Sequence, residues 1–223
     1  MLFILTGKVQ TGKTRWLQRF VEEVENEGGR CDGVIAPGDW RRVGEGESGP
    51  SYEKFGIFNE MLPGHERVLF AVRRDLVGGD GRPGARGVPE TGRSPRTGFG
   101  WAFRDEAIRR VDEWFVRLGE TAVGPGLLVV DELGRLELER GTGLANALRM
   151  VGEGPTDSHP VALAVVREDL LGLARERFSE AWGEVREISP DGASFETAMA
   201  SLKAAGIFPS HGVTPREAGG RLS

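Results

Sequence analysis

The feature that most constrains this chain is a glycine-rich octapeptide near its start, GKVQTGKT at residues 7–14. It follows a continuous apolar run at residues 2–6, which is typical of a strand buried on both faces of a sheet. It precedes residues 15–27, where apolar side chains recur at helical spacing until the glycine pair at residues 28–29 ends the pattern. The sequence therefore predicts a buried strand, a tight turn and a helix in direct succession.

The octapeptide matches the pattern G-x-x-x-x-G-K-[ST], in which each fixed position has a chemical reason. Gly7 and Gly12 allow the backbone to wrap around a phosphate with its N–H groups pointing inward. The positive end of the following helix would face the same phosphate. Lys13 would place an ammonium on the β- and γ-phosphates, and the Thr14 hydroxyl would coordinate Mg²⁺. The predicted nucleotide-binding residues are Gly7, Lys8, Val9, Gln10, Thr11, Gly12, Lys13, Thr14 and Arg15.

An ordinary glycine-rich turn between a strand and a helix is the alternative to a phosphate-binding loop. Lysine is scarce in this chain, so a lysine at the required position is not expected by chance. The lysines are Lys8, Lys13, Lys54 and Lys203. Arg15, directly after the loop, is either a further nucleotide contact or an exposed residue of the first helical turn.

A second apolar run, residues 127–130, ends in the acidic pair Asp131-Glu132. This pattern describes a buried strand whose carboxyl end enters a cleft, which is where open α/β sheets bind ligands. Asp131 would hold Mg²⁺ together with Thr14, through the water shell of the ion. Glu132 would orient or deprotonate the water that attacks the γ-phosphate, so Lys13 and Glu132 are the predicted catalytic residues. An acidic helix cap after a strand is the alternative for both acids.

The rest of the chain alternates strand-like and helix-like segments. Further strands are expected at residues 31–36, 161–166 and 185–188, and a β-hairpin at residues 54–59 and 67–72. Helices are expected at residues 102–120, 144–151, 168–177 and 195–205, and a loop at residues 37–50. This order predicts an α/β fold whose mostly parallel sheet is covered by helices on both faces, with the antiparallel β-hairpin added at one edge.

The composition indicates one domain with a loop and a tail. Nothing marks a linker between two cores, so we expect a single domain at residues 1–206 and a polar C-terminal tail at residues 207–223. Residues 73–100 carry six arginines and many glycines, and are expected to form an inserted, flexible basic loop. That loop is either a lid over phosphates or a solvated insertion in an arginine-rich chain.

Charge and hydrophobicity exclude several classes of partner. The net charge of −5 argues against a nucleic-acid-binding surface. No apolar run reaches the roughly 20 residues of a membrane span, and the apolar start does not have the charge order of a signal peptide. A single cysteine, Cys31, excludes an internal disulfide, and the histidines show no metal-ligand spacing. We expect a soluble, cytoplasmic protein without a membrane partner.

The segment around the acidic pair, VDELGRLEL at residues 130–138, resembles the D-E-I-G-K-M-E-L signature of the THEP-type nucleoside-triphosphatases. That family also has its phosphate loop at the start of the chain. The resemblance implies the P-loop NTPase fold, a three-layer α/β sandwich. It also implies Mg²⁺-dependent hydrolysis of ATP, GTP and other nucleoside triphosphates to diphosphate and phosphate. Arg135 stands where the family usually has lysine, and Gln10 stands where it usually has glycine.

Two other functions stay open from the sequence. One is a P-loop kinase that transfers the γ-phosphate to a small molecule, and the other is a nucleotide-dependent adaptor module that serves a partner or an oligomer. Glu132 directly after Asp131 favours water as the acceptor. No N-K-x-D element that would read guanine occurs, so broad or ATP-leaning specificity is expected. Trp40 is a candidate for stacking on the base. Candidate arginine fingers are Arg93, Arg96, Arg104, Arg167 or an arginine of a second subunit.

Overall fold

The apolar runs form parallel strands at the centre of a mixed sheet. The computed structural model describes residues 1–8, 10–46, 49–76 and 100–209. Across the sheet, the parallel strands are β2 (Cys31–Ile35), β7 (Leu127–Leu133), β8 (Val161–Val166), β1 (Leu2–Leu5) and β9 (Val185–Ile188). Because β1 and β7 both pair with β8 in parallel, their carboxyl ends lie at the same edge of the sheet. The loops that follow these two strands therefore meet.

Antiparallel strands extend the sheet beyond β2. They are β4 (Gly49–Leu62), β5 (Glu66–Arg73) and β6 (Trp101–Phe103), and β3 (Gly38–Gly46) pairs with β4. The predicted hairpin is confirmed as β4 and β5. The predicted loop at residues 37–50 is wrong, because Gly38–Gly46 form β3 and β4 begins at Gly49. Most of β3 is exposed, so it lacks the apolar alternation that reveals a strand in sequence.

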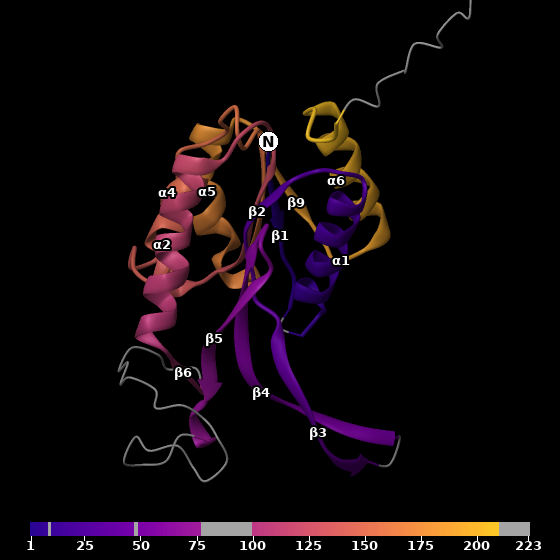
Figure 1. Ribbon diagram of the computed structural model, residues 1–223, viewed down its shortest axis with the longest axis vertical. Helices are drawn as coiled ribbons and strands as arrows, with labels where there is room; N and C mark the ends of the chain where they lie inside the picture. The colour runs from indigo at the N-terminus through magenta and orange to yellow at the C-terminus, as the bar shows by residue number, and fades with distance from the viewer. Residues whose placement is uncertain (9, 47–48, 77–99, 210–223) are drawn as a thin grey trace, which may run out of the picture.

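Helices cover both faces of the parallel strands (Figure 1). On one face lie α1 (Lys13–Asn26) and α6 (Gly192–Ala204), and on the other lie α2 (Asp105–Thr121), α4 (Ala145–Gly152) and α5 (Leu171–Trp182). Side chains of β1 alternate between the two cores. Leu2 and Ile4 pack with α2, α4 and α5, while Phe3 and Leu5 pack with α1 and α6. The predicted α/β fold is thus confirmed, with a larger antiparallel part than a single hairpin.

Several predicted helix boundaries need correction. Trp101–Phe103 pair with β5 as β6, so α2 begins at Asp105 and not at residue 102. Glu168–Leu170 form the short 3-10 helix η2 before α5, and Arg74–Leu76 form another, η1. The short helix α3 (Arg135–Leu138) was not predicted. Helix α1 begins at Lys13, inside the octapeptide, and α6 begins at Gly192 after the side chain of Asp191 caps it.

The division into one domain and a tail stays a prediction, and residues 77–99 of the predicted basic loop lie outside the described residues. Ile207, which was assigned to the tail, is buried against the core that contains α1 and α6. Within the part of the chain that the structure describes, no helix combines the length and the apolar character needed to cross a bilayer.

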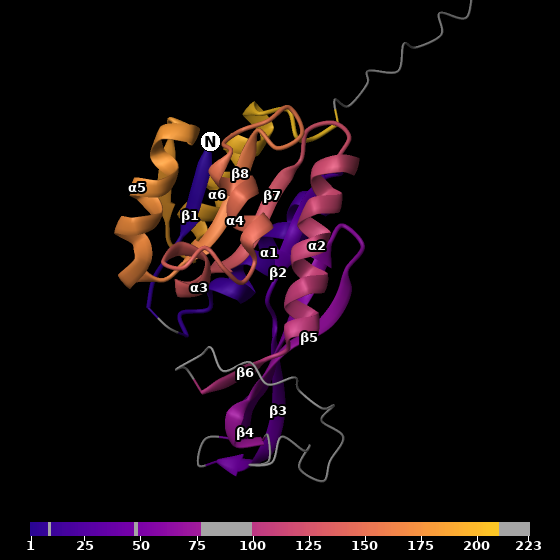
Figure 2. The same ribbon diagram turned by 90° about the vertical axis from the view of Figure 1, so that its left-hand side faces the viewer.

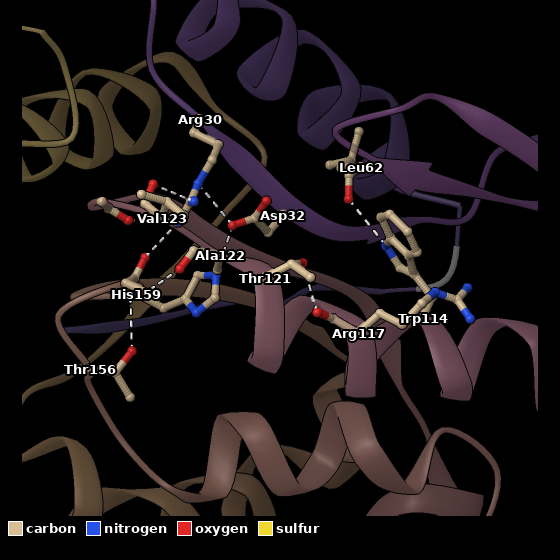
Figure 3. A network of polar contacts seen from close by, with 12 residues as sticks. Arg30, Asp32, Leu62, Trp114, Arg117, Thr121, Ala122, Val123, Thr156 and His159 are labelled. Carbon is tan, nitrogen blue, oxygen red and sulfur yellow. Dashed lines mark hydrogen bonds and ion pairs between the residues drawn. The ribbon is translucent and has the colours of Figure 1, made fainter.

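A buried polar network holds the amino ends of the central strands (Figure 3). Asp32 of β2 is 2% exposed, and its Oδ2 lies 2.8 Å from Nε2 of His159 and 3.0 Å from Nε of Arg30. The guanidinium of Arg30 also donates to the carbonyls of Val123, Gly124 and Ser158. The network therefore joins β2 to the loops that precede β7 and β8, far from their carboxyl ends.

Replacing Asp32 with alanine should lower the free energy of unfolding by about 2 kcal/mol, because the buried His159 and the partly buried Arg30 would lose the oxygen that they contact. The matched control is Asp39→Ala. Asp39 pairs with the exposed Arg41 on β3, so its loss should change stability by less than about 1 kcal/mol. Urea unfolding of both variants checks the prediction. Equal, small effects would show that the network does not stabilise the fold.

Candidate functional site

The octapeptide forms the turn from the carboxyl end of β1 to the start of α1. Gly12 is the residue before α1 and has φ +85°, and Gly7 has φ +137°, so both positions favour glycine. No side chain caps the helix start. The N–H groups of the first turn of α1 lack intrahelical acceptors, and their positive end faces the loop. The loop thus has the backbone conformation of a cradle for an anion.

Lys13 is held across this loop. Its Nζ donates hydrogen bonds of 2.8 Å to the carbonyl oxygens of Gly7 and Lys8. Burial lowers the pKa of Lys13 below its ordinary value, while the negative charge of Glu132 opposes that shift. The ammonium therefore already occupies the loop, where it can exchange carbonyl acceptors for phosphate oxygens.

Asp131, at the carboxyl end of β7, meets Thr14 of α1. The Thr14 Oγ1 lies 3.5 Å from Asp131 Oδ1, and the N–H of Ala36 donates to Asp131 Oδ2 at 2.9 Å. Asp131 is 5% exposed. Burial raises its pKa to about 6, although the hydrogen bond from Ala36 acts in the opposite direction. Two predicted metal ligands that are far apart in sequence are thus brought together.

A β-bulge in β7 changes the backbone direction at Glu132. Val130 pairs with Ala164 and Leu133 pairs with Val166, so residues 131–132 of β7 lie opposite a single residue of β8. Glu132 has φ +76°, which is strained for a residue with a side chain. In a regular strand, neighbouring side chains point to opposite faces. The bulge breaks this alternation at the acidic pair.

Arg167 contacts the Glu132 carboxylate. It follows β8, and its Nε and Nη2 lie 2.8 Å and 2.6 Å from Glu132 Oε1. Its positive charge also acts on Lys13. Of the candidate arginine fingers, Arg167 is therefore placed at the acidic pair. Arg93 and Arg96 lie outside the described residues, and Arg104 is the residue before α2.

The oxygen donors of Thr14 and Asp131 suit Mg²⁺, which prefers hard oxygen ligands and keeps several waters. Within the described residues, no group of three or more histidine, cysteine, aspartate or glutamate side chains could hold a metal by itself. A hydroxyl and a carboxylate fit an ion that takes its other ligands from a phosphate and water. The residues present therefore fit a magnesium ion that arrives with a nucleotide.

The remaining predicted residues have less defined places. Lys8 and Arg15 are exposed, and Val9 lies outside the described residues. Gln10 has φ +65°, so the glutamine does adopt a backbone conformation that favours glycine. Trp40 is 54% exposed on β3. The base-stacking role of Trp40 stays a prediction.

The segment that follows the acidic pair is held by Glu137. Its buried carboxylate accepts hydrogen bonds from the N–H groups of Gly134 and Leu144, at 3.0 and 3.1 Å. Arg135 instead forms ion pairs with Asp169 and Glu139. In the signature-like segment, Glu137 therefore shapes the turn after β7, while Asp131 and Glu132 lie in the site.

One charged residue near the acidic pair was not predicted from the sequence. Lys54 of β4 interacts electrostatically with Glu132 and Asp131. The scarcity of lysine was the available signal, but the position of residue 54 in a hairpin did not relate it to the loop.

A hollow of about 290 Å³ lies elsewhere, between α1 and α6. It is lined by Trp16, Arg19, Pro190, Asp191, Gly192, Phe195 and Glu196. None of the predicted site residues lines this hollow. The candidate functional site is therefore the phosphate-loop motif together with the acidic pair.

No protein-family model and no curated protein matches this chain. Among solved structures, it is similar to the solution structure of a human cancer-related nucleoside triphosphatase, with a TM-score of 0.53 and 16% sequence identity. The similarity covers 91% of this chain and 95% of that chain. At this identity the likeness shows a shared fold, and the predicted P-loop NTPase fold class is confirmed.

The metal-free protein should become more stable at pH 7.5 when Asp131 is replaced by asparagine. The folded pKa of Asp131 is about 6, above the value of roughly 3.9 for an unfolded chain. Between these values the native state binds more protons, so stability falls as pH rises through this window. The total loss is up to about 3 kcal/mol, and it persists above pH 6.

The Asp131→Asn variant lacks this titration and keeps an oxygen that can accept from the Ala36 N–H. Urea unfolding in EDTA at pH 5 and pH 7.5 checks the prediction. A variant that is no more stable than wild type at pH 7.5 would show that the buried carboxylate does not destabilise the fold.

Proposed function

We propose that this protein is a nucleoside triphosphatase of the THEP type, which hydrolyses ATP, GTP and other nucleoside triphosphates to the diphosphate and phosphate with Mg²⁺. The observation that carries the proposal is the contact between Thr14, in the phosphate-loop motif, and Asp131, in the acidic pair. A turn that is glycine-rich only for structural reasons has no need of a buried carboxylate beside it. The human nucleoside triphosphatase with a similar fold supports the proposal.

Substrate binding would use the loop first. The backbone N–H groups of residues 10–14 would donate to the phosphate oxygens, and Lys13 would turn from the carbonyls of Gly7 and Lys8 to the β- and γ-phosphates. Mg²⁺, held by Thr14 and Asp131, would neutralise negative charge that develops on the phosphates. Asp131 would be ionised in that state, because a nearby cation favours the carboxylate.

Glu132 would act on the water. A carboxylate in this place can accept a proton from water or hold the water in line with the γ-phosphate. Arg167 would fix the orientation of Glu132 through their ion pair. The strained backbone at Glu132 fits this role, since strain of this kind is concentrated at functional sites.

Lys13→Ala should reduce phosphate release by about 100-fold or more, because an electrostatic contact that stabilises the transition state is removed. The measurement is phosphate release from ATP, GTP, CTP and UTP with Mg²⁺, for purified wild type and variant. Lys203→Ala is the control, because Lys203 pairs with Glu27 on the surface, outside the loop. Turnover of Lys13→Ala close to wild type would contradict the phosphate-loop assignment.

Glu132→Gln should bind a nonhydrolysable triphosphate within a few-fold of wild type, and hydrolyse ATP about 100-fold more slowly. The amide keeps the size of the side chain but does not accept a proton from water. Glu139→Gln, at an exposed glutamate that pairs with Arg135, is the control. Normal turnover by Glu132→Gln would show that another residue activates the water. Binding without phosphate release in the wild type itself would instead favour transfer to an acceptor.

A further inference from the structure

Lys54 reaches toward the candidate site from outside the phosphate loop. It lies on β4 opposite Trp40 of β3. A Cβ placed on Gly38 would lie 2.8 Å from the Cε of Lys54, so the lysine stem passes directly over this glycine. Gly38 is only two residues from Ala36, whose N–H donates to Asp131. The stem of Lys54 therefore lies beside the backbone of Gly38, two residues after the residue whose N–H contacts the buried carboxylate.

Lys54 is half-buried, and its head lies over an aromatic ring. Its Nζ lies 5.4 Å from the centre of the Trp101 ring. Within the ranges that the structure describes, no acidic side chain lies at ion-pair distance from Lys54. By contrast, Lys203 lies over the ring of Phe208 and also pairs with Glu27. A partly desolvated ammonium without an ion pair is unfavourable unless an anion is supplied.

The charges around Lys54 are those of the candidate site. Lys54 interacts electrostatically with Glu132, Asp131 and Arg167, and the same groups act on Lys13. Burial lowers the pKa of Lys54, while the two carboxylates oppose that shift. Two lysines from distant parts of the chain thus face one acidic pair.

We propose that Lys54 binds the γ-phosphate of the nucleoside triphosphate, and so makes the site prefer triphosphate over diphosphate. This inference rests on the proposed function. The β- and γ-phosphates would lie between the phosphate loop and the acidic pair. Lys54 would approach from the antiparallel strands, and Trp101 and Gly38 would set its direction. A diphosphate lacks the group that Lys54 contacts, so release of phosphate would end this interaction.

The test compares the binding of AMP-PNP and ADP, each with Mg²⁺, by calorimetry. Lys54→Met keeps the length of the stem and removes the charge. It should weaken AMP-PNP binding about 10- to 100-fold, the range of one charge-assisted hydrogen bond, and leave ADP binding within two-fold. Lys54→Arg should recover most of the loss. Lys203→Met is the matched control, because it also removes a lysine that lies over an aromatic ring.

A second variant leaves the lysine in place. Gly38→Ala puts a methyl group where it would meet the Cε of Lys54 at 2.8 Å and Nε1 of Trp40 at 2.6 Å, so the lysine has to move. It should reproduce part of the AMP-PNP loss, again without an effect on ADP. If Lys54→Met does not fold, AMP-PNP and ADP binding by Gly38→Ala tests the inference in its place.

Three results would overturn the inference. Unchanged AMP-PNP binding by Lys54→Met means that Lys54 does not contact the γ-phosphate, while the proposed function stands. An equal loss of AMP-PNP and ADP means that Lys54 only supports the shape of the site. If wild type binds neither nucleotide, and GMP-PNP and GDP also fail to bind, the proposed function is wrong and the inference falls with it.

Discussion

The candidate site depends on the pairing of β1 and β7 with opposite sides of β8. Parallel pairing puts the carboxyl ends of all three strands at one edge, so the phosphate loop after β1, the acidic pair of β7 and Arg167 after β8 share one place. Helices on both faces bury the strands and hold this register. Thr14 and Asp131 can therefore meet although 117 positions separate them in the sequence.

Several groups at this edge are unfavourable for stability. Asp131 is a buried acid with a raised pKa, and Gln10 and Glu132 have positive φ angles. The opposite ends of the strands show the reverse arrangement, since the buried Asp32 there is satisfied by His159 and Arg30 (Figure 3). The polar groups at the amino ends of the strands thus have partners within the protein. The groups at the carboxyl ends lower stability, and a bound phosphate and cation would compensate their charges.

The antiparallel strands add a second side to the site. They extend away from the parallel part of the sheet (Figure 2), and β3 begins two residues after Ala36, whose N–H contacts Asp131. Lys54 meets Trp101 because β4, β5 and β6 are neighbours, and the charge of Lys54 acts on the acidic pair. A parallel sheet with the same phosphate loop but without these strands would have neither Lys54 nor Trp101.

The sequence alone determined the strand, loop and helix at residues 2–27 and the acidic pair after residue 130, because local spacing carries these features. Tertiary structure decided the rest. The bulge at Glu132 comes from its register against β8, and the strand β3 exists through pairing with β4 and not through burial. Lys54 is placed by Gly38 and Trp101, which are remote from it in sequence. Such contacts leave no periodic pattern, since they join residues whose separation along the chain is arbitrary.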